Sequence, residues 1–306
     1  MITSLQYFAL AVPDVEVGRQ FYTDFGMEAY DDGDRVIMRC FGRDQDQILL
    51  LGNVERKRLH HICFGTPENE IKSMKQSLEA WGCKLVDPPY TGARDGVWFH
   101  DTDELLVCLC VAEEGSARNE TEMYFNTRGI YRRLNERGCS EDQYIARPRR
   151  LGHILLFTGN LKEKVDFYTN VLGMRLSDTM GGDVVAFLRN GNGGDHHVIA
   201  LAQSEKPGFH HASFEFGTVD DIGVAAANMA KKGHKHCWGF GRHVVGSNYF
   251  HYFRDPWGSI VEHFADIDIV DEDQDWEIKD WPLEGNFARW VSDGPLPDDF
   301  LFNSEA

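Results

Sequence analysis

Short apolar runs of the β type alternate with amphipathic stretches along most of the chain. The first run, at 5–14, ends in turn residues and leads to a helical stretch that closes with Phe-Tyr-Thr-Asp-Phe-Gly-Met at 21–27. The same succession recurs at 151–160, and its helical stretch closes with Phe-Tyr-Thr-Asn-Val-Leu-Gly-Met at 167–174. A glycine at this place suits the end of a helix. The two segments therefore predict repeated units in which a strand and a helix precede further strands.

A second pair of segments shows the same order of elements. One begins Leu-His-His-Ile-Cys-Phe at 59–64, and the other begins Phe-His-His-Ala-Ser-Phe at 209–214. The helices and closing strands that follow them are expected near 68–81, 96–111, 219–232 and 248–264. The pattern thus predicts four strand–helix–strands modules, arranged as two tandem pairs.

Composition divides the chain into two domains, a linker and a tail. Residues 113–148 are polar and rich in charge and glycine, so we place there a linker with room for a short helix. The N-terminal domain then covers 1–112 and the C-terminal domain 149–266. Residues 267–306 form an acidic, aromatic tail that we expect to wrap a domain or a partner subunit.

The charge balance narrows the class of ligand. A formal net charge of −18 opposes binding to nucleic acid and to anionic membrane surfaces, so we expect a small neutral substrate. The first residues lack the pattern of a signal peptide, and no apolar run is long enough to cross a bilayer. The seven cysteines include no pair with metal-site spacing and are expected to be reduced thiols. These features favour a cytoplasmic protein.

Comparison of the two halves separates residues that the fold needs from residues that chemistry needs. The His-His pair occurs in both halves, but His153 stands where the first half has Tyr7, and Glu262 stands at about the place of Cys108. Only the C-terminal half therefore combines two histidines with a carboxylate. Two neutral imidazoles and one carboxylate on one face of a divalent iron leave three adjacent positions open. The pair His60 and His61 is interpreted as structural, because its half lacks the other ligands.

The most specific motif lies between 241 and 262. Gly-Arg-His at 241–243 is followed, at 251–262, by His-Tyr-Phe-Arg-Asp-Pro-Trp-Gly-Ser-Ile-Val-Glu. With this motif, residues 1–266 resemble the type I extradiol dioxygenases of the vicinal oxygen chelate superfamily. One position departs from the pattern, because the family has an aliphatic residue or Phe where this chain has His251.

The resemblance implies an α+β fold with four βαβββ modules in two tandem domains, each an incomplete mixed β-barrel of about eight strands. It also implies a homo-oligomer that binds Fe(II), with Mn(II) as the alternative ion, in the second domain only. Its substrates would be O2 and a catechol-type aromatic compound.

Residue roles follow from the same resemblance. The implied metal ligands are His153, His211 and Glu262. His243 is expected to hydrogen-bond the bound oxygen or the substrate, and Tyr252 the substrate oxygen next to the metal. His196 is expected to be the acid–base and substrate-binding group, with His197 as the alternative because the loop varies in length. His210 is then structural, since successive side chains of a strand face opposite sides and only one of the pair can enter the pocket.

One geometric question concerns the turn after Tyr252. A two-residue hairpin turn at Pro256 and Trp257 would place Tyr252 and Glu262 on opposite faces of the ladder. A bulge or a longer loop is therefore required if both residues serve one pocket.

The implied reaction inserts both atoms of O2 into a catechol beside its diol and gives a muconic semialdehyde-type product. One alternative is a non-redox, metal-dependent isomerase or transferase of the same superfamily, which has no need of His196, His243 and Tyr252. Another is a metal-free protein that binds an aromatic ligand in the same concave sheet. An intact set of three ligands argues against the latter.

Overall fold

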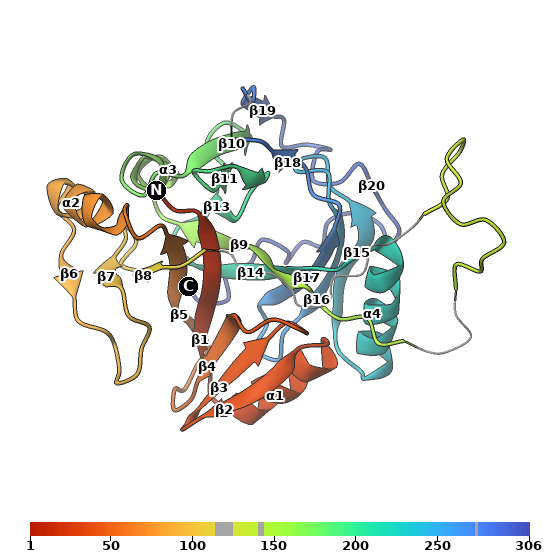
Figure 1. The fold of residues 1–306 in the computed structure, drawn as a ribbon, viewed down its shortest axis with the longest axis horizontal. Coiled ribbons are helices and arrows are strands. Elements are labelled where there is room, and N and C mark those ends of the chain that lie inside the picture. The colour runs from red at the N-terminus through yellow and green to blue at the C-terminus, as the bar shows by residue number, and fades with distance from the viewer. Residues whose placement is uncertain (114–124, 140–143, 273–274) are drawn as a thin grey trace.

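Each half of the chain forms one large mixed β-sheet with two helices packed against it (Figure 1). The computed structural model describes residues 1–113, 125–139, 144–272 and 275–306. No helix within these ranges is both long and apolar enough to span a bilayer.

The first sheet contains eight strands in the order β2-β3-β4-β1-β5-β8-β7-β6. The elements of this half are β1 (Ser4–Ala11), α1 (Val15–Asp24), β2 (Glu28–Asp32), β3 (Arg35–Arg39), β4 (Asp46–Leu51), β5 (Arg58–Thr66), α2 (Ile71–Trp81), β6 (Leu85–Val86), β7 (Val97–His100) and β8 (Leu106–Val111). Strand β1 pairs with β5 in antiparallel fashion, and each of them runs parallel to the last strand of its own module. The two modules therefore join at the centre of the sheet.

The second half repeats this arrangement. Its elements are β9 (Arg150–Thr158), α3 (Leu161–Asn170), β10 (Arg175–Met180), β11 (Val185–Arg189), β12 (Gly194–Asp195), β13 (Ile199–Gln203), β14 (Gly208–Glu215), α4 (Val219–Lys231), β15 (His236–Arg242), β16 (Tyr249–Arg254) and β17 (Ile260–Ala265). The sheet order is β19-β10-β11-β13-β9-β14-β17-β16-β15-β20, and β9 and β14 pair at its centre as β1 and β5 do in the first sheet. The predicted α+β fold with repeated βαβββ modules is confirmed, and both sheets are open rather than closed barrels.

The tail extends the second sheet at both of its edges. It contains β18 (Ile269–Val270), β19 (Lys279–Trp281) and β20 (Trp290–Val291). Strand β19 pairs with β10 and strand β20 pairs with β15, so the tail covers two edges that would otherwise expose unpaired backbone groups. The tail of this chain thus wraps its own C-terminal half.

Local sequence signals explain where the helices begin and end. The side chains of Asp14, Asn160 and Thr218 accept hydrogen bonds from backbone amides in the first turns of α1, α3 and α4. Gly26 and Gly173, which follow α1 and α3, have φ of +109° and +70°. Glycine adopts this left-handed conformation without steric cost, as the sequence predicted.

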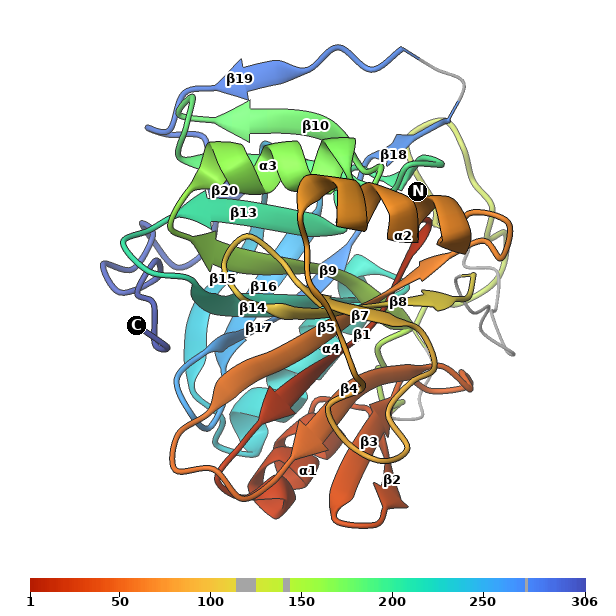
Figure 2. The ribbon, with the colours of Figure 1, turned by 90° about the vertical axis from the view of Figure 1, so that its left-hand side faces the viewer.

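The two halves share one hydrophobic core. The rings of Phe8 and Phe209 stack across the halves with centroids 5.4 Å apart. Helices α2 and α3 lie side by side (Figure 2), where the rings of Trp81 and Phe167 are 5.8 Å apart. The helix allowed for in the linker is absent from 125–139 and 144–148, and the rest of that segment, at 114–124 and 140–143, lies outside the described residues.

Candidate metal centre and active site

Three adjacent strands of the second sheet bring His153, His211 and Glu262 to one face. Ser213 of β14 is the register partner of His153 in β9 and of Glu262 in β17. His211 lies two residues before Ser213 in β14, so its side chain points to the same face. The candidate ligand atoms of the three residues lie within 4.8 Å of one another.

The donor atoms of this triad converge on a common point. Oε2 of Glu262 lies 3.1 Å from Nε2 of His153 and 3.5 Å from Nε2 of His211. Oε2 of Glu262 and Nε2 of His211 are buried and have no hydrogen-bond partner among the described residues. Buried polar atoms normally have partners, and a divalent cation would supply one here. Two imidazoles and one carboxylate fit Fe(II) or Mn(II).

The protonation of the triad also suits a metal. Burial lowers the pKa of His153, which keeps its imidazole neutral. Burial alone would raise the pKa of Glu262, but its contacts with His153, His211 and His243 hold that pKa well below the usual value. Neutral imidazoles and an ionised carboxylate are the forms that bind divalent cations.

His210 and His211 point to opposite sides of β14, as strand alternation predicted. His211 lines the cavity, whereas the ring of His210 packs against those of Phe157 and Phe300. The two Nδ1 atoms are 2.6 Å apart, and Nε2 of His210 lies 2.6 Å from the carbonyl oxygen of Phe300. Burial lowers the pKa of His210 to about 3, so its ring is neutral at ordinary pH.

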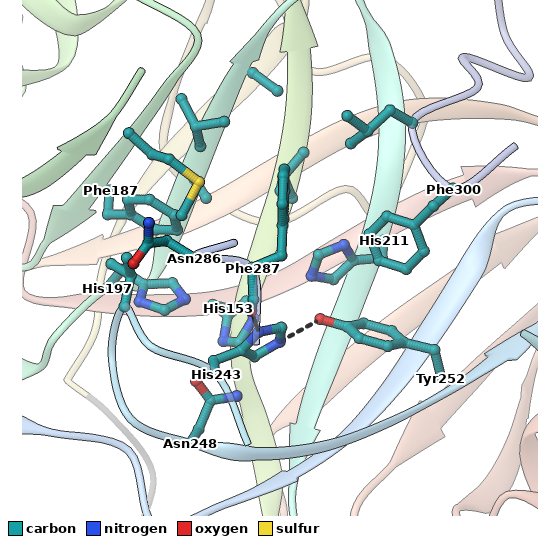
Figure 3. Close-up of a pocket in the computed structure, with 17 residues that line it drawn as sticks. His153, Phe187, His197, His211, His243, Asn248, Tyr252, Asn286, Phe287 and Phe300 are labelled. Atoms are coloured by element: carbon teal, nitrogen blue, oxygen red, sulfur yellow. Dashed lines mark hydrogen bonds between the residues drawn. The ribbon is translucent and has the colours of Figure 1, made fainter. Parts of the chain in front are cut away.

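A cavity opens beside the triad on the same face of the sheet. Figure 3 shows the rings of His153, His197, His211 and His243 around one space. The remaining lining residues are Leu155, Met180, Val185, Phe187, Ala200, Ala202, Val245, Asn248, Tyr252, Asn286, Phe287, Phe300 and Leu301. None of these described residues is an aspartate, glutamate, lysine or arginine. Apart from the imidazoles, the Tyr252 hydroxyl and two amides, the wall is apolar.

His243 and Tyr252 point toward each other at the edge of the cavity (Figure 3). Nε2 of His243 lies 2.8 Å from the hydroxyl of Tyr252, and its Nδ1 lies 2.6 Å from the carbonyl oxygen of Phe287. That carbonyl can only accept a hydrogen bond, so Nδ1 of His243 carries a proton and donates. Burial and the charge of Glu262 raise the pKa of Tyr252 well above its usual value, which keeps the phenol protonated.

The structure places His197, rather than His196, in the cavity. The ring centroid of His197 is 4.4 Å from that of His153. His196 is not among the lining residues, and the segment 196–198 is bent rather than part of β13, so the alternation that turns Ala200 and Ala202 to the cavity does not extend to it. Its Nε2 lies 3.1 Å from the carboxylate of Asp178, and its ring packs against Trp276. The first of the two sequence-based choices for the acid–base group therefore lies outside the cavity, and the alternative lies inside it.

The turn after β16 answers the geometric question raised by the sequence. Tyr252 and Glu262 are directly opposite each other in the β16–β17 ladder and so face the same side. The loop at 256–258 is longer than a two-residue turn, and the amide of Asp255 donates to the carbonyl of Ser259 across its base. Gly258 closes this loop with φ of +99°. Three-residue hairpin loops use a left-handed residue at this position.

His251, the residue that departs from the family pattern, lies away from the cavity. It alternates with Tyr252 along β16, and its Nε2 is 3.0 Å from Nδ1 of His236. Burial, followed by the charge of His236, lowers the pKa of His251 to about 4. The departure therefore affects the opposite face of the strand.

Sequence reasoning missed several residues of the site. Nδ2 of Asn248 donates to Oε1 of Glu262 at 3.3 Å, and Asn248 lies in the stretch between the two parts of the main motif. Phe287 and Phe300 line the cavity from the tail, where no periodic pattern marks an element. A search for polar side chains between His243 and Tyr252 would have found Asn248, whereas the tail residues carry no comparable signal.

The first half holds an equivalent arrangement that lacks the metal-binding chemistry. Tyr7 and Cys108 are both register partners of Cys63, as His153 and Glu262 are of Ser213. Nε2 of His61 lies 3.4 Å from the hydroxyl of Tyr7. Burial raises the pKa of Tyr7, so this position offers a neutral phenol. Within the described ranges, the only cluster suited to a metal is the one in the second half.

Residues 4–109 and 150–263 match the sequence profile of the Glyoxalase/Bleomycin resistance protein/Dioxygenase superfamily. The chain belongs to this superfamily. Among similar proteins, metapyrocatechase 2 of Cupriavidus necator is 36% identical over 100% of this chain and 93% of its own length. The manganese-dependent 2,3-dihydroxybiphenyl 1,2-dioxygenase of Geobacillus genomosp. 3 is 24% identical over 92% of this chain and 90% of its own length. The crystal structure of the Mn(II)-bound glyoxalase from Novosphingobium aromaticivorans superposes with a TM-score of 0.79 and 27% identity, over 97% of this chain and 94% of that one.

Proposed function

We propose that this chain is an extradiol dioxygenase. It inserts both atoms of O2 into a catechol-type aromatic compound and opens the ring beside the diol, so that the product is a muconic semialdehyde-type acid. The observation that carries the proposal is the position of the triad: His153 and His211 line a cavity that also contains His197, His243 and Tyr252, and Glu262 is buried beside them. The similarity to metapyrocatechase 2 over the full chain supports the same reaction class.

His153, His211 and Glu262 would hold one Fe(II), with Mn(II) as the alternative ion. When bound, such an ion supplies adjacent positions for the diol and for O2 and lets electrons pass between them. The carboxylate of Glu262 and the neutral imidazole of His153 are already in the forms that this role requires.

The protons of the diol would be accepted, and hydrogen bonds to its oxygens donated, by His197, Tyr252 and His243. Burial lowers the pKa of His197 well below its usual value, so the neutral ring can take the proton of a substrate hydroxyl. The phenol of Tyr252 is protonated, and its one O–H, which faces Nε2 of His243 in this structure, would turn to donate to the substrate oxygen beside it. In His243, Nδ1 is held by Phe287, so Nε2 is the atom that accepts a proton and can then donate to an oxygen with developing negative charge.

The apolar wall selects the substrate. Met180, Val185 and Ala202 face the cavity from β10, β11 and β13, and no charged side chain lines it in the described part of the chain. A substituent carboxylate would be buried there without a partner, which costs several kcal/mol. We therefore expect a catechol that is uncharged and carries an apolar substituent.

The test uses protein purified without oxygen and stripped of metal. Samples are loaded separately with Fe(II) and Mn(II), and O2 uptake and visible absorbance are followed with unsubstituted, alkyl-, aryl- and carboxyl-substituted catechols. We expect yellow products and one O2 consumed per ring, with apolar substituents giving the highest kcat/KM. His211→Ala serves as the control and should abolish both signals. If neither loaded form consumes O2 with any catechol, the proposed reaction is wrong, and a preference for carboxylated catechols would overturn only the substrate class.

A further inference from the structure

The backbone carbonyl group of Phe300 is connected to the metal centre by hydrogen bonds that pass through His210. The Phe300 carbonyl oxygen, 2.6 Å from Nε2 of His210, can only accept a hydrogen bond, so that nitrogen donates. In a neutral ring, Nδ1 of His210 is then an acceptor. It lies 2.6 Å from Nδ1 of His211, which must therefore donate. Nε2 of His211 is left without a proton, and this is the atom that lies 3.5 Å from the carboxylate of Glu262.

This relay fixes the tautomer that a metal ligand needs. A histidine ligand usually donates its other ring N–H to an oxygen, and that contact orients the ring and makes the ligand nitrogen more basic. In this chain the acceptor is a second histidine, whose own state is set by a carbonyl group from the tail. His210 thus links His211 to the tail.

Residues 300–305, which we call the C-terminal latch, are held firmly in this position. Oε1 of Glu305 accepts hydrogen bonds from Nζ of Lys57 at 2.8 Å and from the amide of Leu59 at 2.9 Å. Its Oε2 accepts from the amide of Phe209 at 3.3 Å. The side chains of Lys57 and Glu305 are buried, so solvent screens their attraction weakly. The latch therefore binds the strands β5 and β14 just before their His-His pairs.

We propose that the C-terminal latch is a positioning element of the metal centre, and that the Phe300 carbonyl acts through His210 to set the tautomer of His211 and hence the affinity for the metal. The inference rests on the proposed function only in that the triad binds a divalent cation. It requires no ring cleavage. His210 is a positioning residue, since it touches neither the substrate cavity nor the candidate ligand point.

The first half supplies a matched control. His60 and His61 repeat the contact, with Nδ1 atoms 2.7 Å apart, in a half without the triad. His210→Phe and His60→Phe each remove one imidazole and keep an aromatic ring of similar size. Mn(II) is titrated into each metal-free protein, and the free ion is measured by electron paramagnetic resonance. We expect His210→Phe to weaken Mn(II) binding about 10–100-fold, as loss of a hydrogen-bond partner of a ligand does elsewhere. His60→Phe should stay within about twofold of the parent.

A second variant tests the carbonyl itself. A chain that ends at Asp298 lacks Phe300 and the latch, and its fold is checked by circular dichroism and thermal melting. If the carbonyl acts through His210, this truncation weakens Mn(II) binding by a similar factor, and combining it with His210→Phe adds little. Full additivity of the two effects, or unchanged Mn(II) affinity in His210→Phe, overturns the proposal. If the truncated chain does not fold, the comparison of His210→Phe with His60→Phe decides alone.

The two proposals fail in different ways. Absence of ring cleavage together with a selective loss of Mn(II) affinity in His210→Phe would refute the dioxygenase activity and leave the relay standing. Ring cleavage together with equal Mn(II) affinities in the parent and His210→Phe would refute the relay alone.

Discussion

His196 and His197 contact each other through their Nδ1 atoms, 3.1 Å apart, yet their rings lie in different environments. The ring of His197 lines the cavity beside His153, whereas that of His196 binds Asp178. Substitution of each of these two adjacent histidines therefore tests separately which one takes part in catalysis and which one stabilises the fold.

We predict that His197→Gln lowers kcat by about 100-fold or more, because general acid–base catalysis commonly contributes 10²–10⁴-fold. His196→Gln should retain kcat within about tenfold and mainly lower thermal stability, since it loses the contact with Asp178. Steady-state kinetics at saturating catechol, normalised to metal content, measures both. A greater loss of kcat in His196→Gln than in His197→Gln would contradict the assignment.

Removal of the Tyr252 hydroxyl should slow the reaction without releasing the metal. Tyr252→Phe deletes the hydroxyl that we propose donates to the substrate oxygen, and loss of such a donor costs about 100-fold in kcat. Tyr249 lies in the same strand but is absent from the cavity wall, so Tyr249→Phe is the matched control with kcat near that of the parent. Metal content is measured in parallel, and an equal loss of kcat in both variants would refute the role of Tyr252.

A buried ion pair between the halves should contribute more to the free energy of unfolding than an exposed ion pair on the same helix. Nζ of Lys164 lies 3.0 Å from the carboxylate of Asp101 and 2.7 Å from that of Asp103, and its side chain is 1% exposed. Lys164→Met leaves these carboxylates unpaired and should lower the free energy of unfolding by about 3–5 kcal/mol. Lys162→Met breaks only the solvent-exposed pair with Asp166 and should change little. Urea unfolding of both variants measures the difference. Similar free energies of unfolding would show that the buried pair stabilises the protein no more than the exposed one.

Stability should fall as the pH drops below about 6.5. Burial, and next the charge of His60, lowers the pKa of His61 to about 3, whereas an unfolded histidine titrates near 6.5. Between these values the unfolded chain binds a proton that the folded chain does not, so the contribution is complete above pH 6.5 and is lost as the pH falls. Each such histidine adds a slope of up to about 1.4 kcal/mol per pH unit.

The slope is measured by urea unfolding of the metal-free protein between pH 7 and pH 4. His61→Gln should flatten it by about one proton. His100→Gln is the control for loss of an imidazole, because His100 lies outside the buried core. An unaltered slope in His61→Gln would refute the buried neutral state of this ring.

Internal repetition explains why so much of the site could be predicted from the sequence. His153 and Glu262 stand out by comparison with Tyr7 and Cys108, and strand alternation alone places one member of each His-His pair on the inner face. The motif at 241–262 added His243 and Tyr252. These predictions depend on local periodicity and on strands that pair within one module.

The remainder depended on features that the sequence does not encode locally. Whether His196 or His197 faces inward is set by the bent segment 196–198 just before β13, which interrupts the alternation that places Ala200 and Ala202 on the cavity side. The face of Tyr252 relative to Glu262 depended in the same way on the length of the loop at 256–258. Phe287 and Phe300 belong to a tail whose strands β19 and β20 form against edges of the second sheet, so tertiary contacts define them.

The retained pair His60 and His61 bears on how this protein could acquire new chemistry. Two substitutions, Tyr7→His and Cys108→Glu, would restore to the first half the residue types that the second half uses, at positions that already share its strand register. The first sheet therefore keeps the strand register of the metal centre without its ligands. It is a starting point for protein engineering, in which a second metal centre is introduced separately from the first.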